Sequence, residues 1–413
     1  MRNTSLSLRY YLFSISNLLA AFGGGLVLGK GIGIINIPHL QNGSVLAFFI
    51  GSIFGLFFLQ FVPRKFSTIL SQWFSIFCSI TSVTLFFLYM HYAQNNVLTG
   101  MSGLVFFLLL SIRFGFWFYS RVMRASNASG QEQSIAYVEF GYYLGMILGL
   151  VIWKLIGLEM NLGIALIIDA IFQLIAGILD IKGNALSISS SSKENPTLLS
   201  TTEILATQDS TKWCWKFALT VVLMTVGVQI IIFNLAHYTD EGFGSYILAT
   251  FYLGVAVAAF IANKLKLFIS WDNKKSIATV VFNQKITVNL LILISISAVA
   301  VLGAIISVHS ISSAAIASVK TYTYIFVFTS IFLAALTYEM ISLALLDRIG
   351  YEEKAVQSDG MIMKTYGLMG LSAAISLWIL GLTENIFQSS IITLLSCLAF
   401  STILILRRKA YGL

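Results

Sequence analysis

The sequence predicts an all-α polytopic membrane protein, with twelve transmembrane helices in two six-helix bundles related by a pseudo-twofold axis along the membrane normal. The 413 residues are 58% hydrophobic and only 10% charged, whereas a soluble chain carries about 25% charged residues. The mean hydropathy is +0.88. Apolar runs of about 20 residues, long enough to cross hydrocarbon as helices, recur along the whole chain. These runs are continuous and do not alternate with polar residues, which excludes a transmembrane β-barrel.

Polar interruptions divide the chain into two halves. The expected spans are 10–35, 43–62, 66–90, 100–121, 132–157, 160–181, 213–236, 245–268, 286–308, 320–346, 355–381 and 386–406. The first run is too long for a cleavable signal peptide. The serine-rich segment 182–212 is the only long polar stretch and is typical of a flexible linker. The sequence therefore predicts an N-terminal six-helix bundle (1–181), a cytoplasmic linker (182–212) and a C-terminal six-helix bundle (213–413).

Basic residues are distributed to one side of the predicted membrane. With the N-terminus inside, the inner loops and helix ends hold nearly all Lys and Arg, whereas the outer loop 91–100 holds none. This asymmetry places both termini in the cytoplasm, and it explains the net charge of +8 without a nucleic-acid partner. Short loops and few cysteines are typical of a bacterial inner-membrane protein. We expect a monomer in the lipid bilayer, with a small-molecule substrate.

The three cysteines predict no special chemistry. Cys78, Cys214 and Cys397 lie in or beside apolar runs and show no metal-ligand spacing. We therefore expect no disulfide framework, no metal site and no cofactor.

The segment 104–153 holds the most informative residues. It contains two apolar helices joined by a polar hinge at 121–134, with Arg113 inside the first helix and Glu139 inside the second. A charge in hydrocarbon is costly, so both residues are functional candidates. Gly141, Gly145 and Gly149 follow at four-residue spacing and predict a smooth face for close helix packing.

An internal repeat supports the division into halves. Shifting the chain by 224 residues places Arg124 on Arg348, Gln133 on Gln357 and Tyr142 on Tyr366. Parallel repeats of this kind are typical of transporters whose site lies between the halves.

This layout resembles the major facilitator superfamily. The segment 60–65 keeps the Arg-Lys pair of that family's loop between spans two and three, but lacks its Asp and Gly. The segment 113–115 is similar to a reduced form of the Arg and Gly motif in span four of proton-coupled members. The glycines of span five match the antiporter signature, whose Pro is absent. The resemblance implies a central cavity lined by spans one, four, seven and ten.

Depth along the predicted helices places four charged residues in one layer, roughly 10–12 Å from the cytoplasmic edge. They are Arg113, Glu139, Glu339 and Lys364, and the repeat makes the second pair resemble the first with its signs exchanged. The four either form two ion pairs that fix helix packing or face the cavity. In the second interpretation Arg113 holds an anionic group by a two-pronged contact and Glu339 carries a proton. Glu339 and Arg348 also loosely resemble the gating ion pair that sugar-type members of the superfamily carry at the cytoplasmic end of span ten.

Two further site candidates lie outside this layer. Lys30 either extends to the outer surface or adds a second cation to the cavity. Tyr142, with its neighbours Trp117, Tyr119 and Tyr143, is a candidate for lining the cavity. We expect Asp169 on a helix that faces lipid or supports the bundle, with Lys154 as a conceivable partner.

These features predict a secondary active transporter that moves a small polar, anionic organic solute by alternating access, with proton coupling through Glu339 or Glu139. A multidrug or metabolite efflux pump is the alternative, and a membrane-embedded enzyme or receptor is a third interpretation. We expect no enzyme activity, because the sequence shows neither a nucleophile–base or metal constellation nor a nucleotide-binding loop.

Overall fold

The structure is a computed structural model. It describes residues 2–31, 34–36, 73–93, 98–128, 135–155, 160–191 and 241–265, with helical pieces within 43–54 and 325–339. The predicted linker beyond 191 and most of the predicted C-terminal bundle lie outside the described residues. The count of twelve helices, the two-bundle arrangement and the domain boundaries therefore stay predictions.

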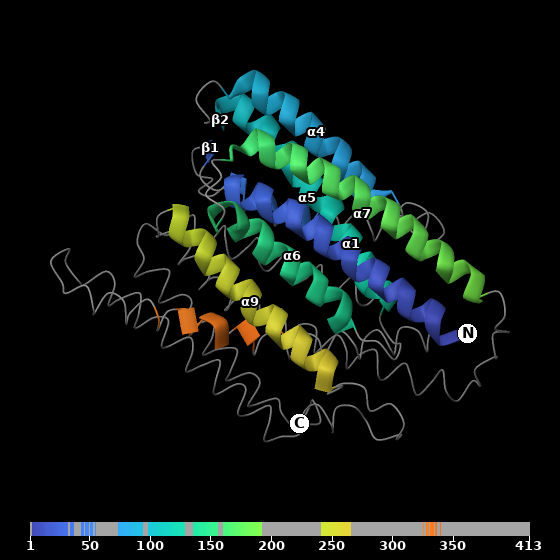
Figure 1. Cartoon of the computed structure of the whole chain (residues 1–413). Helices are drawn as coiled ribbons and strands as arrows, with labels where there is room; N and C mark the ends of the chain where they lie inside the picture. Colours follow the sequence, from blue (N-terminus) through green and yellow to red (C-terminus); the bar gives the residue numbers. More distant parts are fainter. Residues whose placement is uncertain are drawn as a thin grey trace, which may run out of the picture.

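The described elements are almost entirely helical (Figure 1). In chain order they are α1 (Arg2–Gly31), β1 (Ile35–Asn36), α4 (Phe74–Tyr92), β2 (Leu98–Thr99), α5 (Gly100–Ala128), α6 (Ile135–Leu155), α7 (Leu162–Ser191) and α9 (Glu241–Leu265). Within this part of the chain, five helices are long and apolar enough to cross a membrane: α1, α4, α5, α6 and α7. The prediction of a multi-pass helical membrane protein is confirmed to this extent.

Two helices extend well past their predicted C-terminal ends. Helix α5 continues to Ala128, through the first part of the predicted hinge, and α7 continues to Ser191, through the first part of the predicted linker. In α5 the polar residues Arg121 and Arg124 are satisfied by side chains of neighbouring helices, so the helix does not need to end in water. At its other end, α7 begins after Asn161, whose side-chain oxygen accepts the backbone N–H of Ile164 at 2.9 Å.

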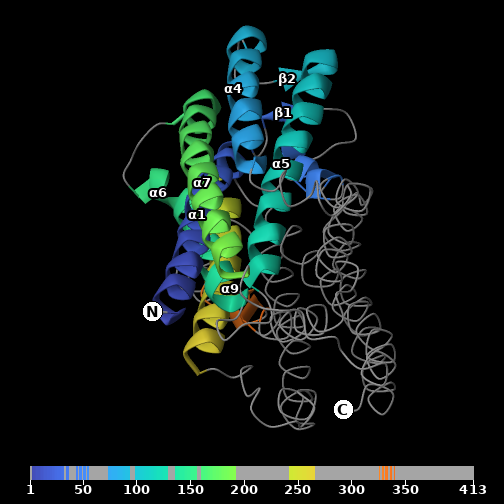
Figure 2. The same cartoon turned by 90° about the vertical axis from the view of Figure 1, so that its right-hand side faces the viewer.

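Helix α1 is central to the described part of the fold. It packs against α6 on one side and α7 on the other, while α4 packs against α5 and α7 (Figures 1 and 2). Helix α9, from beyond the predicted linker, packs against α6. Helix α6 therefore forms a packing contact between the first half of the chain and the second.

Backbone-to-backbone packing of α1 and α6 depends on the α6 glycines. A Cβ atom added at Gly141, Gly145 or Gly149 would run into the backbone carbonyl oxygens of α1 residues Ser14, Leu18 and Phe22, respectively. The two helices therefore share the same four-residue spacing along their contact. This confirms the predicted smooth packing face.

A short strand pair joins the ends of α1 and α5. Ile35 of β1 pairs in parallel with Leu98 of β2, and the Leu98 N–H also donates to the carbonyl oxygen of Ile34 at 3.2 Å. Gly100 follows with a φ of +59°, a conformation that favours glycine and lets the chain turn directly into α5.

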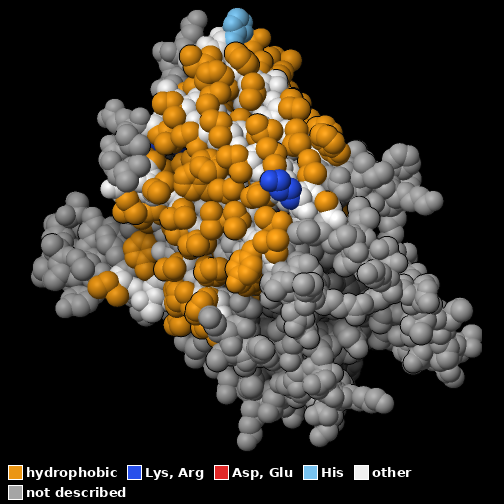
Figure 3. Space-filling view, turned by 45° about the vertical axis from the view of Figure 1, so that its right-hand side comes forward, with side chains coloured by type: hydrophobic (Ala, Val, Ile, Leu, Met, Phe, Trp, Pro, Cys, Tyr) orange, Lys and Arg blue, Asp and Glu red, His pale blue; other side chains and the backbone are white. Residues whose placement is uncertain are grey.

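Large apolar side chains cover the outer faces of α4 and α7. Exposed examples are Ile80, Phe87 and Met90 on α4, and Ile164, Ile171, Ile175 and Ile178 on α7. Figure 3 shows apolar side chains spread over nearly all of the described surface seen from this side. Such a surface is typical of helices that face lipid, because water would disfavour a patch of this extent.

The α1–α6 contact generates a first prediction. Gly145→Ala should destabilise the protein by about 1–3 kcal/mol, because the new methyl group meets the Leu18 carbonyl and the Ala21 side chain. Thermal unfolding of the purified protein in detergent, followed by tryptophan fluorescence, measures this as a lower Tm.

Gly29→Ala is the matched control on the same interface. A Cβ at Gly29 would meet its nearest neighbour, Leu150 Cδ2, at an ordinary 3.4 Å, and alanine favours the helix. Its Tm should equal or exceed that of the wild type. Equal losses in the two variants would contradict the packing argument.

Candidate functional site

Arg113 forms a fully buried ion pair with Asp169. Its Nε donates to Oδ2 of Asp169 at 3.0 Å and its Nη2 donates to Oδ1, while neither side chain is exposed to solvent. Ser82 and Gln173 also donate to the same carboxylate. The predicted pairing of Arg113 with Glu139 is therefore wrong, and Asp169, for which Lys154 was the conceivable partner, pairs with Arg113 instead.

The partner of Glu139 is Arg121. Its Nε and Nη2 donate to Oε2 of Glu139 at 3.0 and 2.7 Å. Arg113 lies eight residues, roughly 12 Å, further along the same helix. The prediction that Arg113 and Glu139 share one layer is thus wrong, because it assumed that the helix ends near Arg121 rather than at Ala128.

Arg124 forms a third pair, with Asp180. Its Nε and Nη2 donate to the two carboxylate oxygens at 2.8 and 2.6 Å, and its Nη1 donates to Oδ1 of Asn17 at 2.8 Å. Ser16 and Ser75 donate to the same carboxylate. Sequence reasoning took Arg124 for a residue of a cytoplasmic loop, whereas its exposure is only 2%. The detectable signal was spacing: both Arg–Asp pairs are separated by 56 residues.

A hydrogen-bonded chain joins the two halves of the sequence. The Tyr143 hydroxyl accepts from Nη2 of Arg121 at 3.1 Å and donates to Oε1 of Glu339 at 2.7 Å. We call Glu139, Arg121, Tyr143 and Glu339 the interhalf chain. Glu339 is 3% exposed. Glu139 and Glu339, which were predicted to lie in one layer, are thus connected through Arg121 and Tyr143.

Aromatic rings surround the interhalf chain. The Arg121 guanidinium lies 3.7 Å from the ring centroid of Tyr142, a cation–π contact. The Tyr142 ring also lies 5.5 Å from Trp117, 5.3 Å from Tyr143 and 6.4 Å from Tyr252 of α9, between centroids. The predicted site residue Tyr142 is therefore next to Glu139 and Arg121, and it is almost completely buried.

The remaining predicted site residues lie elsewhere. The Lys30 Nζ is 3.3 Å from the ring centroid of Trp153, where the last turns of α1 and α6 meet. This cation–π contact holds the ammonium against an aromatic ring of the neighbouring helix. Lys364 lies outside the described residues, so its relation to Glu339 stays a prediction.

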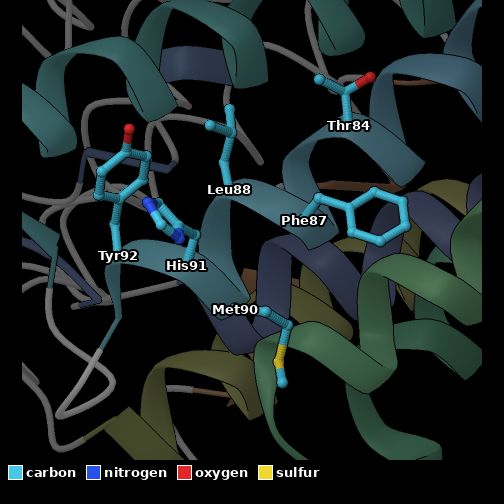
Figure 4. A pocket seen from close by; sticks show the side chains of 6 residues that line it. All are labelled: Thr84, Phe87, Leu88, Met90, His91 and Tyr92. Carbon is cyan, nitrogen blue, oxygen red and sulfur yellow. The ribbon is translucent and has the colours of Figure 1, made fainter.

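A separate hollow lies at the C-terminal end of α4 (Figure 4). It has a volume of about 660 Å³ and is lined by Thr84, Phe87, Leu88, Met90, His91 and Tyr92. All six side chains come from one helix and most are apolar, so the hollow lacks the convergent polar groups of a ligand site. Among the described residues, no cluster of three or more His, Cys, Asp or Glu suits a metal ion.

The three arginines of α5 are each balanced by one carboxylate. Arg113, Arg121 and Arg124 pair with Asp169, Glu139 and Asp180, respectively. Charged pairs with several further hydrogen bonds can be accommodated in a low-dielectric interior. Glu339 differs from these carboxylates, because its hydrogen bond within the described part of the chain comes from a neutral tyrosine.

Comparison with solved structures identifies the fold. The chain is similar to the POT family transporter PepTSo, with a TM-score of 0.61, 10% identity and 98% coverage of each chain. It is also similar to the xylose transporter XylE from E. coli in a partially occluded inward open conformation, with a TM-score of 0.59, 11% identity and coverage of 96% and 98%. A third similar structure is a bacterial homologue of the iron transporter ferroportin, in an outward-facing state with soaked iron. Its TM-score is 0.58 and its identity 11%, and the match covers 96% of this chain and 98% of that chain.

Sequence comparison gives no further assignment, since no protein-family profile and no curated protein matches the chain. The solved relatives are transporters of the major facilitator type, and the likeness spans nearly the full chain. The chain therefore has a major facilitator-like transporter fold. The resemblance inferred from the sequence is confirmed at the level of the fold.

The buried Arg113–Asp169 pair generates a second prediction. Asp169→Asn should destabilise the protein by about 3–5 kcal/mol, because it leaves Arg113 charged and unbalanced inside the bundle. The double variant Arg113→Gln/Asp169→Asn should recover much of this loss, since it removes both charges.

Lys182→Gln is the control for a charge change on α7, because Lys182 is exposed. Its unfolding free energy should stay within about 0.5 kcal/mol of the wild type. Thermal and denaturant unfolding in detergent measure all four proteins. Additive losses in the double variant would contradict a direct Arg113–Asp169 coupling.

Proposed function

We propose that this chain is a secondary active transporter that moves a small polar organic solute across the membrane by alternating access, with proton coupling through Glu339. The major facilitator-like fold supports this proposal. Its solved relatives also include the nucleoside transporter NupG and the fucose:proton symporter FucP. The proposal places the protein in a bacterial inner membrane with both termini in the cytoplasm, as a monomer without enzyme activity.

The Tyr143–Glu339 contact carries the proposal. Glu339 belongs to the second half of the chain and Tyr143 to the first, and the two side chains meet through a 2.7 Å hydrogen bond in a buried position. Moving the halves apart on this side would break the bond and admit water to the carboxyl group. Burial disfavours the charged form of a carboxyl group, whereas water favours it. Conformation and protonation of Glu339 are thereby linked.

Arg121 links a second carboxylate, that of Glu139, to the interhalf chain. It already pairs with Glu139 and also donates to the Tyr143 hydroxyl. Because the guanidinium keeps its proton, Arg121 stabilises negative charge on either side of Tyr143 without titrating itself. Tyr142, Tyr143 and Tyr252 surround this region with rings, which limits access of water in the conformation described.

The solute need not be an anion. The anionic class predicted from the sequence depended on Arg113 holding the solute by its two-pronged fork, but Nε and Nη2 of Arg113 already bind Asp169. The three arginines of α5 are each balanced by a carboxylate and together add no net positive charge. We therefore propose a polar solute and leave the anionic class as a prediction that depends on residues such as Lys364.

A second candidate function is export of amphipathic compounds. The ring cluster around Tyr142, which includes Trp117, Tyr143 and Tyr252, favours it because aromatic faces bind flat apolar groups. Accumulation of a lipophilic dye in inverted vesicles, driven by a proton gradient, would distinguish this activity from solute uptake.

Glu339→Gln generates a third prediction. In proteoliposomes with an imposed pH gradient, the variant should lose uphill accumulation of labelled solute, because glutamine carries no titratable proton. It should keep solute exchange at equal concentrations, which requires no net proton movement. D-xylose, uridine and succinate serve as the labelled probes.

Tyr143→Phe should reduce uphill accumulation while keeping exchange, because Glu339 loses its hydrogen-bond donor. Tyr89→Phe is the matched control, since Tyr89 is similarly buried but lies on α4, away from the interhalf chain. It should behave as wild type. Undiminished accumulation in Glu339→Gln would rule out this residue as the coupling group, and failure of the wild type to carry any probe would count against transport of these solutes.

A further inference from the structure

The acidic residues of the five apolar helices all lie inside the bundle. Helices α1, α4, α5, α6 and α7 together contain three of them, Glu139, Asp169 and Asp180. All three are buried, and each is bound by one of the α5 arginines. A further basic residue on these helices therefore finds no unused carboxylate within them.

Lys182 of α7 is such a residue. Its side chain is exposed, whereas Asp180, two residues earlier on the same helix, is buried against Arg124. Lys182 has no hydrogen bond or ion pair with any of the residues that the structure describes. A lysine ammonium group is charged at neutral pH. The counter-charge of Lys182 must therefore come from a partner outside these helices.

Lys182 lies on the side of α7 that faces lipid. It follows the exposed residues Ile171, Ile175 and Ile178 by eleven, seven and four positions, and these spacings place residues on one side of a helix. Figure 3 shows a basic side chain among apolar ones, and no acidic side chain is visible on the described surface seen from this side. The lysine therefore adds a positive charge to an otherwise apolar face of α7.

The position of Lys182 along α7 is that of the lipid headgroups. The apolar span of this helix ends at Gly183, the next residue, while the helix itself continues to Ser191. This part of α7 is packed on its other side, because a Cβ at Gly183 would lie 2.9 Å from the Phe13 ring of α1. Lys182 is therefore held on a packed helix, at the level where hydrocarbon gives way to headgroups.

An exposed tryptophan marks the same level on the neighbouring helix. Trp73 precedes α4 and is 45% exposed. Ser75, two residues further along, donates to Oδ2 of Asp180, which lies two residues before Lys182. Trp73 and Lys182 are thus at the same end of two packed helices. Because tryptophan is enriched at the boundary between hydrocarbon and headgroups, both side chains suit one headgroup-level surface.

Charge and depth select the partner of this surface. A zwitterionic phospholipid carries its own cation beside the phosphate, whereas an anionic phospholipid does not, so the anionic lipid gains more from an ammonium group that has no carboxylate partner. The acyl chains of such a lipid fit the adjoining apolar faces, which carry Ile175 and Ile178 on α7 and Ile80 on α4. A soluble acidic partner would gain nothing from these apolar faces.

We propose that Lys182 and Trp73 form a binding site for the headgroup of an anionic phospholipid. Lys182 binds the phosphate, the Trp73 ring packs against the glycerol region, and the acyl chains lie along the apolar faces of α7 and α4. The site is independent of the proposed transport function. It assigns a lipid of defined charge to one place on the surface of the bundle.

Lipid binding to the purified protein in detergent tests the site. In native mass spectrometry, dioleoylphosphatidylglycerol should bind more tightly than dioleoylphosphatidylcholine, and it should also raise Tm more. Lys182→Gln should weaken phosphatidylglycerol binding about fivefold and abolish the additional rise in Tm, because the ammonium group is lost. Lys182→Arg should retain both effects. Without added lipid, Lys182→Gln and the wild type should have the same Tm.

Two further variants separate the site from the general charge of the protein. Lys30→Gln removes one positive charge at the other end of α1, seventeen residues from the Phe13 ring that lies beside Gly183, and should leave phosphatidylglycerol binding unchanged. Trp73→Leu keeps an apolar side chain but removes the ring, and should weaken phosphatidylglycerol binding about 2–5-fold.

Three results would overturn the proposal. Equal phosphatidylglycerol affinity in Lys182→Gln and the wild type, or equal losses in Lys182→Gln and Lys30→Gln, would mean that binding does not depend on this lysine in particular. Unchanged affinity in Trp73→Leu would contradict the two-residue site. Inorganic phosphate at the concentration of the lipid should not raise Tm. If it reproduced the whole effect of phosphatidylglycerol, the site would bind free anions and the lipid assignment would be wrong.

Discussion

A guanidinium group inside a membrane protein must be balanced where it lies, and helix α5 imposes this condition three times. Arg113, Arg121 and Arg124 each take one carboxylate from α6 or α7. Hydroxyl and amide groups of α1 and α4 complete the surroundings of Arg124. Each ion pair forms only when the partner helix has one particular position along α5 and one particular rotation about its own axis. The pairs therefore fix α6 and α7 relative to α5. Apolar packing alone would leave that register less well determined.

Helix α6 uses two different faces. One face packs closely against α1, and the other carries its residues of the interhalf chain. The glycines at 141, 145 and 149 bring the α1 backbone close, while Glu139 and Tyr143 reach toward Arg121 and Glu339. One helix therefore packs closely within the first half on one face and forms a side-chain hydrogen bond to the second half on another. The alternating access that we propose would require such a separation, because rigid and movable interfaces cannot share the same side chains.

The sequence predicted those features of the fold that depend on hydrocarbon thickness, such as helix positions, and on the local spacing of residues along one helix. Runs of apolar residues located α1, α4, α5, α6, α7 and α9, and the α6 glycines predicted their own packing face. The C-terminal ends of α5 and α7 were missed, because polar residues at 121–128 and 182–191 are typical of loops when their partners are unknown. Depth arithmetic grouped Glu139 with Glu339, which the structure connects through Arg121 and Tyr143, but it could not supply the rotation of each side chain about its helix axis.

The partner of Arg113 shows the same limitation most clearly. Asp169 lies 56 residues away, and no local pattern connects the two. The sequence nevertheless shows that Arg113 and Arg124 are separated by the same number of residues as Asp169 and Asp180. This equal separation predicts that the two arginines on one helix pair with the two aspartates on a parallel helix. Either pair considered alone would not be convincing. Tyr143 had no comparable signal, because its importance arises from a residue in the other half of the chain.

The same separation of 56 residues has a consequence for biosynthesis. At about 5–20 residues per second, the ribosome delivers Arg113 roughly 3–11 s before Asp169. During this interval the nascent α5 has no aspartate to balance its deepest arginine, and Arg124 waits equally long for Asp180. Retention of the early helices beside the translocon until α7 is made would give both arginines their aspartates before α5 is surrounded by lipid.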